Sequence, residues 1–176
     1  MALGCDNCSC SDVQSLFQVM KLFCLMAAVS TPGPTPITAA AAFRAATVGG
    51  ARTAGLGDTV GAIRPGLKAD LLILDLADPA YVPFNSALRQ LVFADSGRAI
   101  ETVIVNGKTV IRDGRMVTID EAELRALVER SMPVVRRDFA RLSADFAKVR
   151  PYLDEVQRRT WTDPHPANRF VGAPRF

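Results

Sequence analysis

The dipeptide Asn106-Gly107 places the strongest constraint on how this chain can fold. It stands between two runs that are rich in β-branched residues, Thr102-Val-Ile-Val105 and Thr109-Val-Ile-Arg112. Asn-Gly in such a position is a strong signal for a β-hairpin, because both central residues of the favoured two-residue turn need a positive φ. The sequence therefore predicts two antiparallel strands joined at this dipeptide.

Further short strands are expected around this hairpin. Leu71-Leu-Ile-Leu74 predicts a buried strand between two aspartates, and Arg115-Met-Val117 predicts a short strand after the turn Asp113-Gly114. A short helix is expected over residues 86–93. Since glycines and prolines separate these runs, residues 56–117 are expected to form an antiparallel or mixed sheet module.

Two helices are expected before this module. Residues 11–29 carry apolar residues at the spacing of an amphipathic helix, with Ser11 as its N-cap. A second helix, rich in alanine, is expected to be capped by Thr35 and to run to Thr47. Its alanines make it slim enough to approach another element closely, and Gly49-Gly50 is expected to stop it.

The C-terminal third predicts further helices. Thr118-Ile-Asp-Glu121 is a capping box that indicates a helix start. Pro133 is expected to kink or restart this helix, with a second stretch over residues 134–149 and a third over residues 151–160. The tail over residues 162–176 is rich in proline and glycine and is expected to be extended.

Composition narrows the class of protein. A chain of 176 residues, 49% of them hydrophobic, can bury a core and is not disordered by composition. The net charge of +3 arises after residue 114, where arginines alternate with acids as on a solvated face. No basic block indicates nucleic acid, and the apolar run over residues 22–29 is too short to cross a membrane. Without a secretory signal, the expected setting is the cytoplasm.

Asp6 is the candidate catalytic residue. The opening Met1-Ala-Leu-Gly-Cys-Asp6 predicts a short buried strand over residues 2–5 that ends in a carboxylate. An α/β barrel places its catalytic groups at such strand ends. From position alone, two interpretations stay open, because Asp6 could equally cap the loop or helix that follows.

The four cysteines support a second hypothesis, a thiol metal site. They follow the pattern Cys5-x2-Cys8-x-Cys10-x13-Cys24. No second closely spaced cysteine pair and no nearby histidine completes the ligand pattern of a common zinc site. The simpler interpretation is that small residues line a tight loop and that Cys24 is a core residue. The single histidine, His165, stands between prolines and is expected at the surface.

Three stretches of the sequence carry a resemblance. The first is Ala2-Leu-Gly-Cys-Asp6 with the small-residue loop after it and Phe17 on the following helix, and the second runs from Thr35 to Gly57. The third is Gly61-Ala-Ile-Arg-Pro-Gly-Leu-Lys-Ala-Asp-Leu71, followed by Val105–Lys108 and Asp113-Gly114. Together they resemble the C-terminal portion of the metal-dependent amidohydrolase superfamily. The branch is that of the cytosine, guanine, adenosine and S-adenosylhomocysteine deaminases and the triazine hydrolases.

This resemblance implies a fold class of α/β plus β. Residues 1–55 would supply the last strand of a TIM barrel and its helices. Residues 56–117 would form a small β-sandwich module, and residues 118–176 would form C-terminal helices and an extended tail. Lys68 and Asp70, in the third stretch, are expected to be structural.

The resemblance also implies an activity and a role for Asp6. The intact enzyme would hydrolyse a carbon–nitrogen bond that is not a peptide bond, deaminating a small molecule with a nucleobase-like or triazine-like ring. The aspartate after the last barrel strand would bind a divalent metal, zinc or iron, and take a proton from the attacking water. Asp6 is thus expected to be both catalytic and metal-binding.

The departures from that family limit this expectation. Its metal ligands are mainly histidines, and one carboxylate cannot hold a catalytic zinc, which takes three or more protein ligands. Because Asp6 stands so near Met1, we expect this chain to be a C-terminal fragment relative to that family. Because the family's histidines are absent from it, we expect it to be inactive alone and to hold no catalytic metal of its own. The alternatives are a non-catalytic module that pairs with a separate N-terminal half or with copies of itself, and a thiol metal-binding protein.

Overall fold

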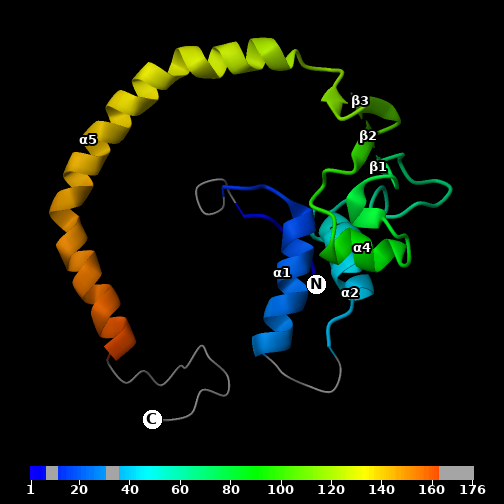
Figure 1. Ribbon diagram of the computed structural model, residues 1–176, viewed down its shortest axis with the longest axis horizontal. Coiled ribbons are helices and arrows are strands. Elements are labelled where there is room, and N and C mark those ends of the chain that lie inside the picture. Colours follow the sequence, from blue (N-terminus) through cyan, green and yellow to red (C-terminus); the bar gives the residue numbers. More distant parts are fainter. Residues whose placement is uncertain (7–11, 31–35, 163–176) are drawn as a thin grey trace. The chain divides into compact units, whose positions relative to one another are not determined.

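The computed structural model describes residues 1–6, 12–30 and 36–162, and the chain divides into two compact units, Met1–Thr118 and Ile119–Phe176. The second unit contains helix α5 (Glu121–Thr162). The elements of the first unit are α1 (Leu16–Ser30), α2 (Ala39–Arg44), the π-helical turn η1 (Ala45–Gly49), α3 (Gly50–Thr53), β1 (Leu71–Leu74), the 3₁₀ turn η2 (Pro79–Tyr81), α4 (Ala87–Phe93), β2 (Ile100–Val105), β3 (Lys108–Arg112) and β4 (Arg115–Met116) (Figure 1).

The four strands form one antiparallel sheet in the order β1-β2-β3-β4. The predicted hairpin is confirmed, because Val105 pairs with Lys108 across a turn in which Asn106 and Gly107 have φ values of 49° and 78°. The turn at Asp113-Gly114 leads into β4 as expected. The local sequence therefore predicted the positions of the strands and turns of this module.

The layers of the sheet module differ from the expectation. The described residues form one sheet, whereas the resemblance implied a sandwich of two. Leu72 and Ile73 of β1 are exposed, so the prediction of a buried strand was wrong. An apolar strand becomes buried only when a second layer covers its face, and the described residues supply no such layer.

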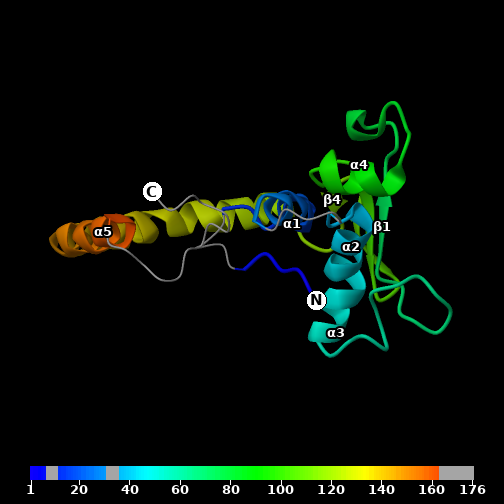
Figure 2. The same cartoon turned by 90° about the horizontal axis from the view of Figure 1, so that it is seen from below.

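The core of the first unit lies among α1, α2 and α4, with α3 continuing the line of α2 (Figure 2). Its buried residues come from α1, α2 and α4: Met20, Cys24, Ala39, Ala42 and Val92. The expected slim alanine helix is confirmed, because alanine side chains let α2 approach both neighbours closely. Cys24 is a small core residue, as the simpler interpretation held.

The first two helices begin later than predicted. α1 begins at Leu16, where the hydroxyl of Ser15 accepts a hydrogen bond from the N–H of Gln18 (3.4 Å). The N-cap of α2 is Thr38, whose hydroxyl accepts from the N–H of Ala41 (3.2 Å). The predicted caps Ser11 and Thr35 lie outside the described residues.

Gly49-Gly50 does not stop the second helix, so that prediction was wrong. Both glycines keep helical φ values of −64° and −58°, and the chain continues through η1 and α3 to Thr53. A glycine inside a helix costs only about 1 kcal/mol relative to alanine, which neighbouring contacts can offset. The helical run ends instead near Gly55, which has a φ of 73°.

α5 is one continuous helix of 42 residues, so of the two expected effects of Pro133, a kink or a restart, the restart was wrong. Asp120 rather than Thr118 caps it, accepting hydrogen bonds from the N–H groups of Ala122 (2.8 Å) and Glu123 (3.1 Å). Pro133 and Pro151 each remove one backbone hydrogen bond, but the helix continues through both positions. No helix in the described segments is both long and apolar enough to cross a membrane.

Candidate functional site

Asp6 lies at the end of the first described segment, with an exposed side chain and a φ of 58°. Aspartate and asparagine tolerate this left-handed conformation better than most side chains do. The other non-glycine residues with positive φ, Asn106 and Asp113, occupy hairpin turns that require it. Among the described residues, the carboxylate of Asp6 has no hydrogen-bond or ion-pair partner.

The segment that carries Asp6 is anchored on the helical core. The N–H of Leu3 donates to the carbonyl oxygen of Ala45 in η1 (3.2 Å), and the Leu3 side chain packs against the core residues. A Cβ at Gly49 would overlap the carbonyl oxygen of Met1, so only glycine admits this close approach. Asp6 therefore lies three residues after Leu3, whose backbone is hydrogen-bonded to η1.

The segment is nevertheless not a strand, so the prediction of a buried strand over residues 2–5 was wrong. These residues are half-buried or exposed and pair with no strand in the described part of the chain. A strand forms only beside a partner whose backbone groups it can pair with. The backbone of this segment instead makes its contact with η1.

The described cysteines do not gather into a metal site. Cys5 is half-buried and Cys24 is buried in the helical core, and both are free thiols. Burial raises the pKa of the Cys24 thiol, which disfavours the thiolate that a metal needs. Cys8, Cys10 and His165 lie outside the described residues.

The described residues do not by themselves fit a catalytic metal. Within residues 1–6, 12–30 and 36–162, no group of three or more His, Cys, Asp or Glu side chains is placed to hold an ion. A catalytic zinc takes three protein ligands and an open position. Asp6 can be at most one of several contributors.

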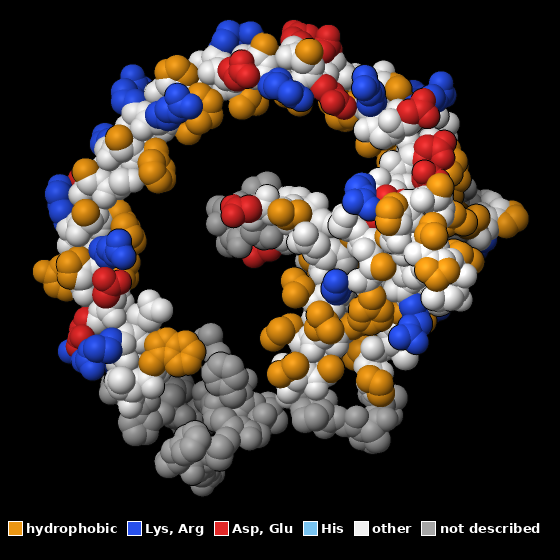
Figure 3. Space-filling model, viewed as in Figure 1, with side chains coloured by type: hydrophobic (Ala, Val, Ile, Leu, Met, Phe, Trp, Pro, Cys, Tyr) orange, Lys and Arg blue, Asp and Glu red, His pale blue; other side chains and the backbone are white. Residues whose placement is uncertain are grey.

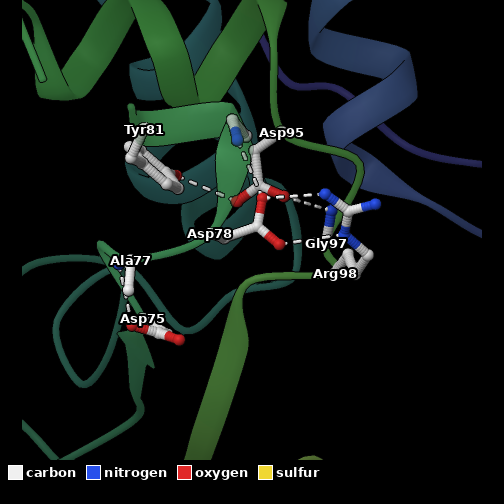
Figure 4. A network of polar contacts seen from close by, with 8 residues as sticks. Asp75, Ala77, Asp78, Tyr81, Asp95, Gly97 and Arg98 are labelled. Atoms are coloured by element: carbon white, nitrogen blue, oxygen red, sulfur yellow. Dashed lines mark hydrogen bonds and ion pairs between the residues drawn. The ribbon is translucent and has the colours of Figure 1, made fainter. Parts of the chain in front are cut away.

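A polar network that sequence reasoning missed joins η2 to the loop after α4 (Figure 4). The buried Tyr81 hydroxyl donates to the carboxylate of Asp95 (2.9 Å), and that carboxylate also accepts from the N–H of Gly97 (2.8 Å). Arg98 forms a two-point ion pair with Asp78 (2.9 and 3.1 Å). The only local signal for this network is Asp78-Pro79, a common start of a short helical turn.

The pKa shifts of this network indicate a structural role. The Arg98 guanidinium lowers the pKa of the Asp78 carboxyl, and the bond from the Ala80 N–H adds to this effect. Burial, followed by the hydrogen bond to Asp95, raises the pKa of Tyr81 well above its usual value. Groups held this firmly in one protonation state stabilise the fold and are poorly suited to proton transfer.

Asp70 also has a structural role, which agrees with its expected one. Its carboxylate accepts from the N–H of Asn106 (2.5 Å), while the N–H of Gly107 donates to the carbonyl of Ala69 (2.9 Å). These bonds hold the hairpin turn against the loop before β1. Asp70 is therefore occupied by the fold and is not a candidate for chemistry.

The outer face of α1 is apolar and exposed. Met20 and Cys24 face the core, whereas four large apolar residues point away from it: Leu22, Leu25, Met26 and Val29. Figure 3 shows hydrophobic side chains gathered along this helix. A patch of this kind is typical of a surface that another protein segment covers.

The sequence is similar to a known protein family and to curated proteins. Residues 1–110 match the model of the family described as "Amidohydrolase family". The chain is 33% identical over 139 residues to the 5-methylthioadenosine/S-adenosylhomocysteine deaminase of Pelotomaculum thermopropionicum, covering 78% of this chain and 32% of that protein. It is 34% identical over 124 residues to the 5'-deoxyadenosine deaminase of Methanosarcina mazei, covering 70% of this chain and 28% of that protein.

The fold is also similar to a solved structure, that of an adenosine deaminase from Xanthomonas campestris with bound zinc. The TM-score is 0.74 at 30% sequence identity, and the match covers 77% of this chain and 31% of that chain. The chain thus spans about a third of the length of the curated relatives it matches.

Proposed function

This chain belongs to the amidohydrolase family, and on that premise we propose that it is the part of a deaminase that contributes Asp6 to the active site. The proposed reaction is hydrolysis of the exocyclic carbon–nitrogen bond of a small aminopurine nucleoside. The oxygen of water bonds to the ring carbon, and the amino nitrogen leaves as ammonia. The names of the relatives in Pelotomaculum and Methanosarcina support this substrate class.

The observation that carries the proposal is the position of Asp6. Its carboxylate is exposed, and the segment before it is anchored to η1 by the Leu3–Ala45 hydrogen bond. An exposed carboxylate on an anchored segment can hold a proton at a defined place, which general acid–base catalysis requires. The resemblance of the Asp6 segment to the last barrel strand of the family supports the same role.

The metal of the proposed enzyme needs residues beyond Asp6. The sequence contains one histidine, and the described residues supply no cluster of ligands. We therefore expect the isolated chain to release no measurable ammonia from adenosine or 5'-deoxyadenosine. Ammonia release by the pure chain, without a second polypeptide, would overturn this expectation.

A chimera tests the role of Asp6. In it, this chain replaces the matching third of the Xanthomonas campestris adenosine deaminase, whose own remaining residues complete the active site. The chimera is expected to release ammonia from adenosine, and Asp6→Asn is expected to lower kcat by about a hundredfold or more. Asparagine suits a positive φ, so this change removes the charge without straining the backbone.

Asp113→Asn is the matched control in the same chimera. Asp113 is also an exposed aspartate with positive φ, in the turn before β4. The Asp113→Asn substitution is expected to leave the kcat of the chimera unchanged. Equal activity of the Asp6→Asn and Asp113→Asn chimeras would contradict the catalytic role of Asp6.

A second candidate function is that of a module that associates with a separate polypeptide carrying the rest of the enzyme. The exposed apolar face of α1 favours it, because water-exposed Leu22, Leu25 and Met26 are stabilised by burial against a partner. Co-purification with a histidine-rich protein that restores deamination would support this candidate. Charged substitutions on this face would then abolish both the co-purification and the restored activity.

A further inference from the structure

α5 exposes a long apolar stripe. None of its 42 residues is buried. Large side chains such as Phe139, Leu142 and Phe146 are more than half exposed, and Figure 3 shows hydrophobic side chains along the concave side of this helix. A helix of this kind gains most of its stability from packing of its apolar face, so a partner for the stripe is expected.

The apolar residues of α5 repeat every 3.5 residues over four heptads. One set, at the heptad position d, is Val128, Val135, Leu142, Val149 and Val156. The other set, at position a, alternates with the first at spacings of four and three. It consists of Met132, Phe139, Phe146 and Leu153. We call these nine residues the seam; an unbroken 3.5-residue repeat of this length is the signature of a left-handed coiled coil.

The two prolines of α5 are compatible with the seam. Pro133 falls at heptad position b and Pro151 at position f, both on the side of the helix away from the seam. A proline bends a helix away from its own side, because its ring crowds the preceding turn. Both bends therefore curve α5 towards the seam, the direction in which supercoiled helices curve.

From the seam we propose that α5 assembles with the α5 helices of other copies of this chain into a parallel coiled coil. The occupant of the apolar stripe is thus the same stripe of a second copy. Large residues at a with β-branched residues at d favour three or four helices over two, so a trimer or tetramer is expected. This assembly is independent of the proposed deaminase function.

The charges beside the seam favour the parallel arrangement. In parallel helices, Asp145 at position g faces Arg150 at position e of the neighbouring helix, and no like charges face each other across the interface. In fully overlapping antiparallel helices, Asp138 instead faces Asp145 of the other copy. Asp145 and Arg150 already pair within the helix, with Lys148 (2.9 Å) and Asp154 (3.7 Å), so the charges select orientation more than they add affinity.

Two adjacent valines test the seam in the full chain. Val135 lies in the seam and Val134 at position c outside it, although the single chain exposes them equally, at 52% and 51%. Sedimentation equilibrium of the wild-type chain is expected to give a trimer or tetramer. Val135→Glu is expected to weaken assembly about tenfold or more, since a charge would be buried without a partner, whereas Val134→Glu leaves it unchanged.

The same measurement can overturn the proposal. A monomeric or dimeric wild-type chain would contradict it, as would an assembly that Val135→Glu and Val134→Glu weaken equally. Circular dichroism of both variants checks that the helix persists. If the exposed face of α1 drove the assembly instead, Val135→Glu and Val134→Glu would have the same effect on it.

A charge reversal tests orientation. Asp145→Arg places like charges opposite each other in the parallel assembly and is expected to weaken it, by about twofold to fivefold, at low salt. In the antiparallel arrangement the same change would replace the Asp138–Asp145 repulsion by attraction and strengthen assembly. Stronger assembly of Asp145→Arg would therefore overturn the parallel arrangement.

Discussion

At the residue scale, the Tyr81–Asp95 pair is the best example of a buried interaction that defines the first unit. Tyr81 is 1% exposed and Asp95 is 5% exposed, and their hydrogen bond joins η2 to the loop after α4. A buried carboxylate stabilises a fold only when its hydrogen bonds are made. Asp95 meets this condition through Tyr81 and the backbone of Gly97.

Removal of the Tyr81 hydroxyl is expected to destabilise the chain. Tyr81→Phe leaves one oxygen of the buried Asp95 without its donor, which should lower the free energy of unfolding by about 1–3 kcal/mol. Tyr152→Phe is the control, since Tyr152 is 73% exposed on α5 and its change should be close to neutral. Urea unfolding of both variants measures the difference, and equal stabilities would contradict the role of this bond.

The same tyrosine predicts a dependence of stability on alkaline pH. Because burial raises the pKa of Tyr81 in the folded chain, an unfolded tyrosine ionises first, at a pKa of about 10. The stabilisation from Tyr81 is therefore fully present below about pH 10 and decreases above it. Tyr81→Phe should lose part of this alkaline destabilisation, as urea unfolding at neutral and alkaline pH would measure; an unchanged pH dependence would argue against it.

At the element scale, the helical run from α2 to α3 both forms core and anchors the segment that carries Asp6. Two adjacent glycines in this run have similar helical φ values but different surroundings. A Cβ at Gly49 would overlap the Met1 carbonyl, whereas a Cβ at Gly50 would meet no atom within 4 Å. The anchoring of the N-terminal segment therefore depends on Gly49.

This difference predicts opposite effects of two alanine substitutions. Gly50→Ala should stabilise the chain by up to about 1 kcal/mol, since alanine is the better helix former. Gly49→Ala should displace the N-terminal segment and weaken the Leu3–Ala45 bond. Hydrogen exchange at the Leu3 amide measures this; equal protection in both variants would show that Gly49 does not hold the segment.

At the scale of the whole molecule, the core and the long helix belong to separate units. Every residue of the helical core lies within Met1–Thr118, and α5 buries none of its residues. Stability of the first unit is therefore expected to be largely independent of the second. Assembly through α5 would add its own, concentration-dependent contribution.

Truncation tests this independence. A chain of residues 1–118 is expected to unfold cooperatively in urea. Its free energy of unfolding should lie within about 0.5 kcal/mol of the value for the first unit in the full-length Val135→Glu variant, in which assembly is weakened. Tyr81 is the only tyrosine of the short chain, which contains no tryptophan, so its fluorescence reports on the core. Loss of the cooperative transition would show that α5 supports the first unit.

Local chemistry allowed much of this structure to be predicted. Asn106-Gly107 determined the hairpin because the turn needs two residues with positive φ. The short helix expected over residues 86–93 is α4, which Ser86 caps. Asp6 could be singled out as a candidate because a carboxylate follows a short apolar run. The resemblance to the family also rested on such short stretches.

Other features depended on contacts between residues far apart in the chain, and no local pattern predicted them. Gly49 lies against the Met1 backbone, and the carboxylate of Asp95 is buried and bonded to Tyr81. Residues 2–5 form no strand, because none of the strands in the described residues pairs with them. Burial and strand pairing are properties of the surroundings of a residue. The sequence by itself therefore determined turns, caps and candidate groups, whereas only the tertiary structure decided which groups are buried, anchored or left exposed.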